Sequence, residues 1–226
     1  MAEVTGGIGH GPVEPGRDCP LCPRLVDFRR KHRALEPSWH NAPVPSFGSD
    51  DARLLIVGLA PGLRGANRTG RPFTGDFAGD LLYETLGEFG FAQGSYAARP
   101  DDGLRLVGAM LTNAVRCVPP ENKPVGAEIA TCRTFLSATI AGLPRLAVLV
   151  ALGRIAHEST LRALGARQAA HPFVHGAMHR IAGPHGPLVL ADSYHCSRYN
   201  TNTGRLTPAM FKSVFAAVRA ELDRGA

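Results

Sequence analysis

The chain has 226 residues, 44% of them hydrophobic, and a formal net charge of +6. This length and apolar content suit one domain with a proper core. No apolar run approaches the ~20 residues of a membrane-spanning helix, and the first residues lack the basic and apolar regions of a signal peptide. We therefore expect a cytoplasmic protein whose positive charge permits a polyanionic partner such as nucleic acid.

Residues 1–18 are rich in Gly and Pro without periodicity, which predicts a flexible N-terminal tail before a folded domain over 19–226. A short basic helix is predicted over 25–35, followed by an irregular proline-rich passage. Further along, apolar runs typical of buried strands alternate with stretches whose apolar residues recur at helical spacing. We expect strands at 54–57, 107–116, 146–152 and 187–195, and helices at 77–91, 129–143, 155–164 and 207–222.

This alternation predicts an α/β fold, because parallel neighbouring strands need crossover connections. We expect a single three-layer αβα domain around a central, mainly parallel, four-stranded sheet. The loops after the first, second and fourth strands leave from the same edge of such a sheet, so their polar residues converge in one cleft. These residues are Asn67, Phe73 and Asp76 from the first loop, Asn113 from the second, and His195, Ser197, Arg198 and Asn200 from the last.

The first of these loops follows the strand in RLLIVGLAPGLRGANRTGRPFTGD, residues 53–76. Its glycines allow backbone N–H groups to approach a substrate without interference from side chains. An arginine, an aromatic ring and a carboxylate within a few residues indicate a binding site. The alternative is an ordinary connection between a strand and a helix.

Four of the five cysteines form a natural group, Cys19 and Cys22 in a C-x-x-C motif with Cys117 and Cys132 further along. In an intracellular chain this pattern indicates a metal or cluster site more readily than disulfides. The spacing does not choose between tetrahedral zinc and an iron–sulfur cluster, and independent buried thiols are the remaining alternative. Cys196 lies outside this group and is expected to be a packed thiol beside His195.

Several motifs together resemble the uracil-DNA glycosylase superfamily, and within it the family 5 (type b) enzymes. They are GLAPG, NRTGRPFTGD, TNAVRC and HCSRYNTNTGRLT, which recur in this order from residue 58 to residue 207. The resemblance implies a uracil-DNA glycosylase-like fold and a [4Fe–4S] cluster on Cys19, Cys22, Cys117 and Cys132. In such enzymes the cluster has a structural role.

The resemblance also implies roles for the residues of the cleft. Phe73 would stack on a flipped pyrimidine and Asn113 would pair with its Watson–Crick edge. His195 would stabilise the departing base, aided by backbone N–H groups of Gly58, Ala60 and Gly62. Asp76 would orient the attacking water, because Leu59 replaces the polar residue that several superfamily members carry there. Without the resemblance, Phe73 is equally a core residue, Asn113 a turn residue and Asp76 a helix cap.

Further residues are expected to contact the substrate or the DNA. Asn67 belongs to the first loop and is assigned to substrate binding, while Ser197, Arg198, Asn200, Arg68 and Arg71 are assigned to DNA binding. The remaining histidines of 171–187 are expected at the surface, and His157 is expected to be structural.

The leading hypothesis is a monomeric, monofunctional DNA glycosylase that excises uracil and leaves an abasic site. Because the first motif lacks a polar base, we extend the hypothesis to other damaged bases, including hypoxanthine. The alternative is a non-catalytic iron–sulfur module that binds nucleic acid. A phosphate loop is excluded because GLAPGLRG lacks the Lys–Ser/Thr pair that such loops require.

Overall fold

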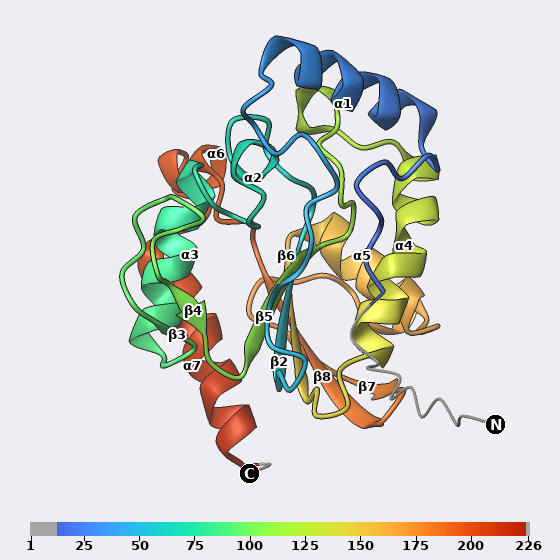
Figure 1. The fold of residues 1–226 in the computed structure, drawn as a ribbon. Helices are drawn as coiled ribbons and strands as arrows, with labels where there is room; N and C mark the ends of the chain where they lie inside the picture. The colour runs from blue at the N-terminus through green and yellow to red at the C-terminus, as the bar shows by residue number, and fades with distance from the viewer. Residues whose placement is uncertain (1–12, 225–226) are drawn as a thin grey trace, which may run out of the picture.

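A six-stranded, mainly parallel sheet organises the computed structural model, which describes residues 13–224 (Figure 1). The strand order is β1-β5-β2-β6-β8-β7. Most of the predicted N-terminal tail lies on residues 1–12, outside the described residues. The strands are β1 (Phe47–Gly48), β2 (Leu54–Gly58), β5 (Ala109–Asn113), β6 (Val148–Leu152), β7 (Met178–Gly183) and β8 (Gly186–Ser193).

The four central strands β5, β2, β6 and β8 are the predicted ones, and they pair in parallel. This confirms the α/β fold with a mainly parallel sheet. The predicted strand number was too low, because β1 and β7 pair antiparallel at the two edges. Strand β1 has only two residues and β7 is half exposed, so neither carries the continuous apolar run of a buried strand.

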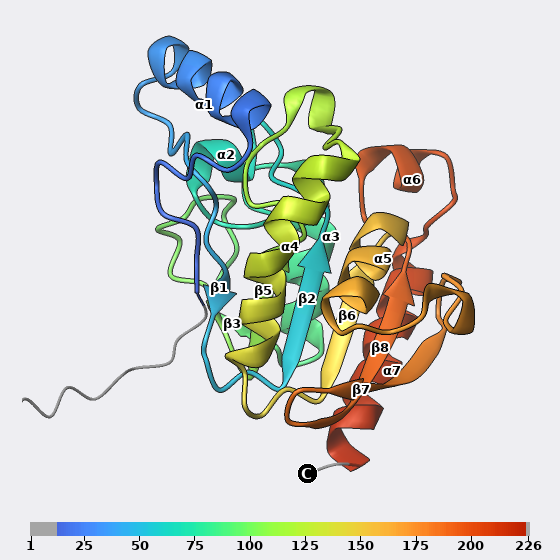
Figure 2. The same cartoon turned by 90° about the vertical axis from the view of Figure 1, so that its right-hand side faces the viewer.

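Helices cover both faces of the sheet, with α4 and α5 on one face and α3 and α7 on the other (Figure 2). Successive strand residues alternate between the two cores: Leu54 and Ile56 pack toward α3 and α7, whereas Leu55 and Val57 pack toward α4 and α5. The covering helices are α3 (Phe77–Glu88), α4 (Gly126–Ala141), α5 (Arg154–Ala163) and α7 (Pro208–Arg224).

Short elements gather at the carboxyl ends of the parallel strands, where α1, α2 and α6 lie (Figure 1). These helices are α1 (Pro23–Leu35), α2 (Ala66–Thr69) and α6 (Arg198–Asn202). The remaining elements are the ribbon of β3 (Ala92–Gln93) and β4 (Arg105–Leu106), and the 3₁₀ turns η1 (Pro120–Asn122) and η2 (Gln168–Ala170). Within 13–224, every helix is too short or too polar to cross a membrane.

The loop between α2 and α3 is anchored by Arg71. Its guanidinium donates two hydrogen bonds of 2.7 Å to the carboxylate of Asp102 and a third, also of 2.7 Å, to Thr74. Aromatic rings surround the same guanidinium, and only 5% of the Arg71 side chain is exposed. The prediction that Arg71 contacts DNA was therefore wrong: its partner carboxylate, 31 positions away, already takes up the charge.

Replacing Asp102 with alanine is expected to lower the free energy of unfolding by about 3–5 kcal/mol, because it leaves the Arg71 charge buried without its partner. Urea denaturation followed by circular dichroism measures this difference. Asp101→Ala is the matched control: Asp101 pairs with Arg99 at the surface, so its loss should change stability by no more than about 0.5 kcal/mol. Equal effects of the two variants would contradict the anchoring role.

Candidate active site

A cavity of about 840 Å³ opens at the carboxyl ends of the central strands. Its walls come from the loop after β2, the first turn of α3, the end of β5, the loop after β6 and the start of α6. The structure thus brings together residues that lie far apart in the sequence, from Leu59 to Arg198. Of the residues predicted from the sequence, those lining the cavity are Ala60, Gly62, Phe73, Asp76, Asn113, His195, Ser197 and Arg198.

The Phe73 ring and the Asn113 side chain meet over Gly58, which pairs with Asn113 in the parallel register of β2 and β5. A Cβ atom on Gly58 would come within 2.4 Å of both Asn113 Oδ1 and Phe73 Cζ. Gly58 therefore does not line the cavity itself. It leaves the room in which the ring and the amide sit side by side.

The backbone of Phe73 adopts a left-handed conformation with φ of 54°, which is costly for a residue with a bulky side chain. Hydroxyl groups hold the backbone in place: Tyr96 donates to the carbonyl oxygen of Phe73 over 3.2 Å, and Tyr83 donates to that of Pro72 over 2.7 Å. Gly79 allows the approach of α3, since a Cβ there would lie 1.9 Å from the Phe73 carbonyl oxygen. These hydrogen bonds and the packing of α3 thus fix the position of the Phe73 ring, because its backbone conformation alone is unfavourable.

The carboxylate of Asp76 lies at the start of α3 and faces the same cavity. Its side chain makes no capping hydrogen bond, and Oδ1 is buried without a partner among the described residues. Gly62 and Gly65 make room for it, because a Cβ at these positions would lie 3.0 and 2.4 Å from Oδ2. Burial raises the pKa of Asp76 above its ordinary value. Asp76 also occupies the N-cap position of α3, and the backbone N–H groups of Gly79 and Ala78 partly offset the rise in its pKa, so the helix-cap alternative stands beside the catalytic one.

His195 follows β8, and its ring lies 6.1 Å from that of Phe73, centre to centre. Burial lowers the pKa of His195 to about 4, so the imidazole is neutral at neutral pH. A neutral imidazole donates one hydrogen bond through its N–H. The neighbouring Cys196 is buried and its thiol contacts the Ala78 carbonyl oxygen, in agreement with the packed thiol expected from the sequence.

Besides Gly58 and Arg71, three predicted residues lie outside the cavity. Asn67 is buried and donates a hydrogen bond to Asn41 Oδ1 over 2.9 Å, so it supports the loop and does not meet a substrate. Asn200 donates to the backbone carbonyl oxygen of His195 over 2.8 Å, which positions the last loop. The exposed Arg68 borders a separate hollow beside Trp39. The substrate role of Asn67 was therefore wrong, whereas DNA contact by the partly exposed Asn200 and by Arg68 stays a prediction.

A family model described as "Uracil DNA glycosylase superfamily" matches residues 45–219 of this chain. The chain belongs to the uracil DNA glycosylase superfamily. This match confirms the resemblance found in the sequence motifs. The matched segment includes the cavity-lining residues from Leu59 to Arg198.

Relatives in this superfamily cover most of the chain. A protein of Thermus thermophilus named "Type-5 uracil-DNA glycosylase" is 50% identical over 202 residues, which cover 87% of this chain and 90% of the relative. Proteins of the same name from Mycobacterium leprae and Pyrobaculum aerophilum are 42% and 39% identical. They are aligned over 94% and 92% of this chain, and over 96% and 90% of their own lengths.

The loop after β6 also lines the cavity, although the sequence patterns did not predict this. Gly153, with φ of +97°, turns the chain from β6 into α5, and the exposed Arg154 and Ile155 then line the cavity. Phe77 was also missed, and the Arg198 guanidinium lies 5.3 Å from the centre of its ring. A glycine directly after a buried strand was a visible signal, since Gly153 immediately follows the apolar residues of β6.

The four grouped cysteines line one small hollow away from the cavity. Cys22 caps helix α1, Cys117 follows β5 and Cys132 lies within α4. The sulfur of Cys132 accepts a hydrogen bond from the Arg116 backbone N–H, and that of Cys117 from Arg29. Burial raises the pKa of Cys117 to about 12 and that of Cys132 to about 11, so without a metal these thiols keep their protons.

Titration of His195 provides a test of this electrostatic description. Its ring proton signals, followed by NMR, should shift with a midpoint near pH 4, because burial disfavours the charged imidazolium. Between that value and the ordinary pKa of ~6.5, the unfolded chain binds the proton more readily, so this histidine makes stability rise with pH across that window. A midpoint at or above pH 6 would contradict the proposed environment.

Proposed function

We propose that this protein is a monofunctional DNA glycosylase that flips uracil out of DNA and hydrolyses its N-glycosidic bond, which initiates base excision repair. One observation carries the proposal: Phe73, Asn113, Asp76 and His195, from three separate segments, all face one cavity. The family membership and the names of the relatives support the same reaction.

Recognition of the base is assigned to Phe73 and Asn113. The Phe73 ring offers an apolar face for stacking, and the Asn113 amide offers one acceptor and two N–H donors. Uracil presents an N–H group between two carbonyl oxygens, so an amide of fixed orientation distinguishes it from cytosine. Asn113 is only 3% exposed, and its close fit against Gly58 limits the orientations that its amide can take.

Bond cleavage is assigned to Asp76 and His195. Breaking the glycosidic bond places positive charge on the sugar and negative charge on the departing base. The ionised Asp76 carboxylate orients the attacking water and stabilises the sugar, while the neutral His195 donates an N–H to the base oxygen. Backbone N–H groups of the loop over 58–62 add to that stabilisation. This division of roles requires a deprotonated Asp76 and a neutral His195. Activity should therefore fall at low pH, as Asp76 takes up a proton.

Exposed side chains around the cavity are assigned to the DNA. Arg64, Arg154, Ser197 and Arg198 line its rim, and Arg68 lies further out on the same loop as Arg64. Guanidinium groups at such a rim suit phosphate oxygens, which fix the position of a duplex without reading its sequence. The protein is proposed to act as a monomer, since the cavity is complete within one chain.

The lesion range is proposed to extend beyond uracil. Leu59 lines the cavity at a position where a polar side chain could hold the attacking water. Without such a side chain, catalysis would depend more on the stabilisation of the departing base by His195. A cavity of about 840 Å³ also has room for a purine. Hypoxanthine, like uracil, carries a carbonyl group and a ring N–H on its pairing edge, so it is the second substrate that we propose.

The catalytic assignments are tested with duplex oligonucleotides that carry one uracil or one hypoxanthine, followed by alkaline cleavage at abasic sites. Asp76→Asn is expected to slow base release by about 10²–10⁴-fold, because an amide cannot accept the proton of the attacking water. His195→Ala is expected to cost about 10²–10³-fold through loss of a donor at the departing base.

Asp80→Asn serves as the matched control, since Asp80 lies one turn further along α3 and is exposed. It should leave the rate unchanged. If the original protein and both active-site variants bind DNA but release no base, the alternative of a non-catalytic binding module replaces this proposal. Release of uracil alone would remove hypoxanthine from the substrate range.

The four-cysteine hollow is proposed to hold a [4Fe–4S] cluster. A tetrahedral zinc ion with Zn–S bonds of about 2.3 Å would hold its sulfurs ~3.8 Å apart. No three of the cysteine sulfurs lie within 4.8 Å of one another. Among the described residues, only His157, His179 and Asp192 bring three potential ligand atoms that close together. The wider spacing suits a polynuclear cluster, and the two N–H···S contacts suit its thiolates. The cluster would supply a cross-link between α1, α4 and the segment after β5.

Cys117→Ser is expected to remove iron and sulfide from the purified protein and to lower its melting temperature, because one of four ligands is lost. Elemental analysis and acid-labile sulfide measure the cluster directly. Cys196→Ser is the matched control, since Cys196 is buried but lies outside the hollow. An original protein that binds zinc and no iron would overturn the cluster proposal and leave the glycosylase proposal standing.

A further inference from the structure

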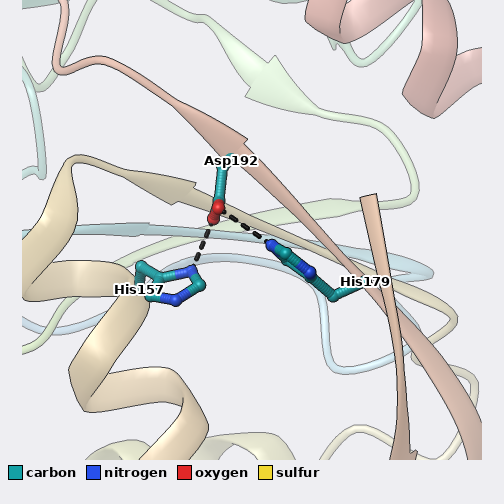
Figure 3. A group of neighbouring side chains, drawn as sticks. All are labelled: His157, His179 and Asp192. Atoms are coloured by element: carbon teal, nitrogen blue, oxygen red, sulfur yellow. Dashed lines mark hydrogen bonds and ion pairs between the residues drawn. The ribbon is translucent and has the colours of Figure 1, made fainter. Parts of the chain in front are cut away.

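Four of the nine histidines of the chain fall within residues 157–179, and three elements bring two of them to one buried carboxylate (Figure 3). His157 comes from α5, His179 from β7 and Asp192 from β8. Only 12% of the His179 side chain is exposed, so the prediction that this histidine lies at the surface was wrong. None of the three residues lines the active-site cavity, and the proposed reaction does not use them.

The ligand atoms of this cluster lie close together around the two carboxylate oxygens of Asp192. His157 Nδ1 lies 2.7 Å from Asp192 Oδ1, and His179 Nε2 lies 3.1 Å from Asp192 Oδ2. All three side chains offer a metal-ligating atom, and these atoms lie within 4.8 Å of one another. Ligand atoms around a tetrahedral zinc ion are roughly 3–3.5 Å apart. The three groups are therefore close enough for small side-chain rotations to bring them to the spacing of a metal site.

The hydrogen bond of His157 Nε2 determines which ring nitrogen carries the hydrogen and therefore which one carries the lone pair. His157 Nε2 lies 2.9 Å from the backbone carbonyl oxygen of His171, which can only accept a hydrogen bond. Nε2 therefore carries a hydrogen, and in the neutral ring the lone pair lies on Nδ1 and points at a carboxylate oxygen. Both atoms can ligate a metal ion, and a proton shared between them is the alternative occupant of the 2.7 Å gap.

The surroundings match those of metal-ligating residues in proteins. A ligating histidine usually donates its other N–H to a carbonyl or carboxylate, as His157 does to His171. The carboxylate receives an outer hydrogen bond as well, from the Val174 backbone N–H to Asp192 Oδ2 over 3.3 Å. These partners fix the His157 ring and the Asp192 carboxylate, and they leave His157 Nδ1 and His179 Nε2 facing the carboxylate.

We propose that His157, His179 and Asp192 form a zinc-binding site that is separate from the cysteine hollow. Two imidazole nitrogens and one carboxylate oxygen suit Zn²⁺ better than Mg²⁺ or Ca²⁺, which prefer oxygen ligands. The half-exposed His171, whose ring lies 5.5 Å from that of His179, or a water molecule completes the coordination. The ion would fasten α5 to the edge strands β7 and β8.

Zinc content and zinc affinity of the purified full-length protein test the proposal. After removal of loosely bound ions, we expect one zinc per chain in addition to the metal of the cysteines. His179→Gln should weaken zinc binding by more than the roughly 10–100-fold that loss of an outer partner costs, because it removes a ligand. His185→Gln is the matched control: His185 is exposed and contacts the Ala141 carbonyl oxygen, so zinc content should not change.

Cobalt substitution distinguishes this site from the cysteines. Co²⁺ bound by nitrogen and oxygen shows only weak visible bands, whereas cysteine ligation adds intense sulfur-to-metal bands in the near ultraviolet. Circular dichroism confirms that the His179→Gln variant is folded. If the folded original protein binds no zinc beyond that of its cysteines, or if His179→Gln binds it equally well, the cation between His157 and Asp192 is a proton and the zinc proposal fails.

Discussion

The buried ion pair between Arg71 and Asp102 is the contact on which the active-site geometry depends most directly. It closes the loop that carries both Phe73 and Asp76, and this loop contains a strained residue. A left-handed bulky residue costs of order 1–3 kcal/mol and persists only where its surroundings leave no alternative. The ion pair, the tyrosine hydroxyls and the close approach of α3 supply that constraint. Phe73 and Asp76, the residues proposed for stacking and for catalysis, therefore share one anchored segment.

Burial in the cavity shifts the pKa values of two ionisable side chains, Asp76 and His195, in opposite directions. Burial raises the pKa of Asp76 and lowers the pKa of His195, because each charged form loses contact with water. A site that disfavours charge in this way also strengthens every dipole that faces a developing charge. In the proposed reaction, a neutral imidazole and a few backbone N–H groups would then contribute several kcal/mol to leaving-group stabilisation, without a fixed positive charge beside the base.

Sequence patterns predicted the central strands, the helices between them and the meeting of three loops, because each rests on periodicity or on chain direction. They did not separate residues that face the cavity from those that support it. Asn67, Arg71 and Asn200 look like Asn113 and Arg198 in the sequence, and only their partners Asn41, Asp102 and the His195 carbonyl distinguish them. The edge strand β7 was missed for a related reason, since one half-exposed strand in a Gly- and Pro-rich segment has no strong pattern.

The position of helix α1 has a consequence for how the chain is made. This helix lies across the end of the fold and meets it mainly around the cysteines, where Arg29 contacts Cys117, 88 positions later (Figure 2). On the ribosome, α1 emerges first and must wait unsupported until the segments up to α4 have followed. Its basic, weakly amphipathic sequence keeps it compatible with water during that interval. Docking of α1 therefore depends on segments that are synthesised well after it.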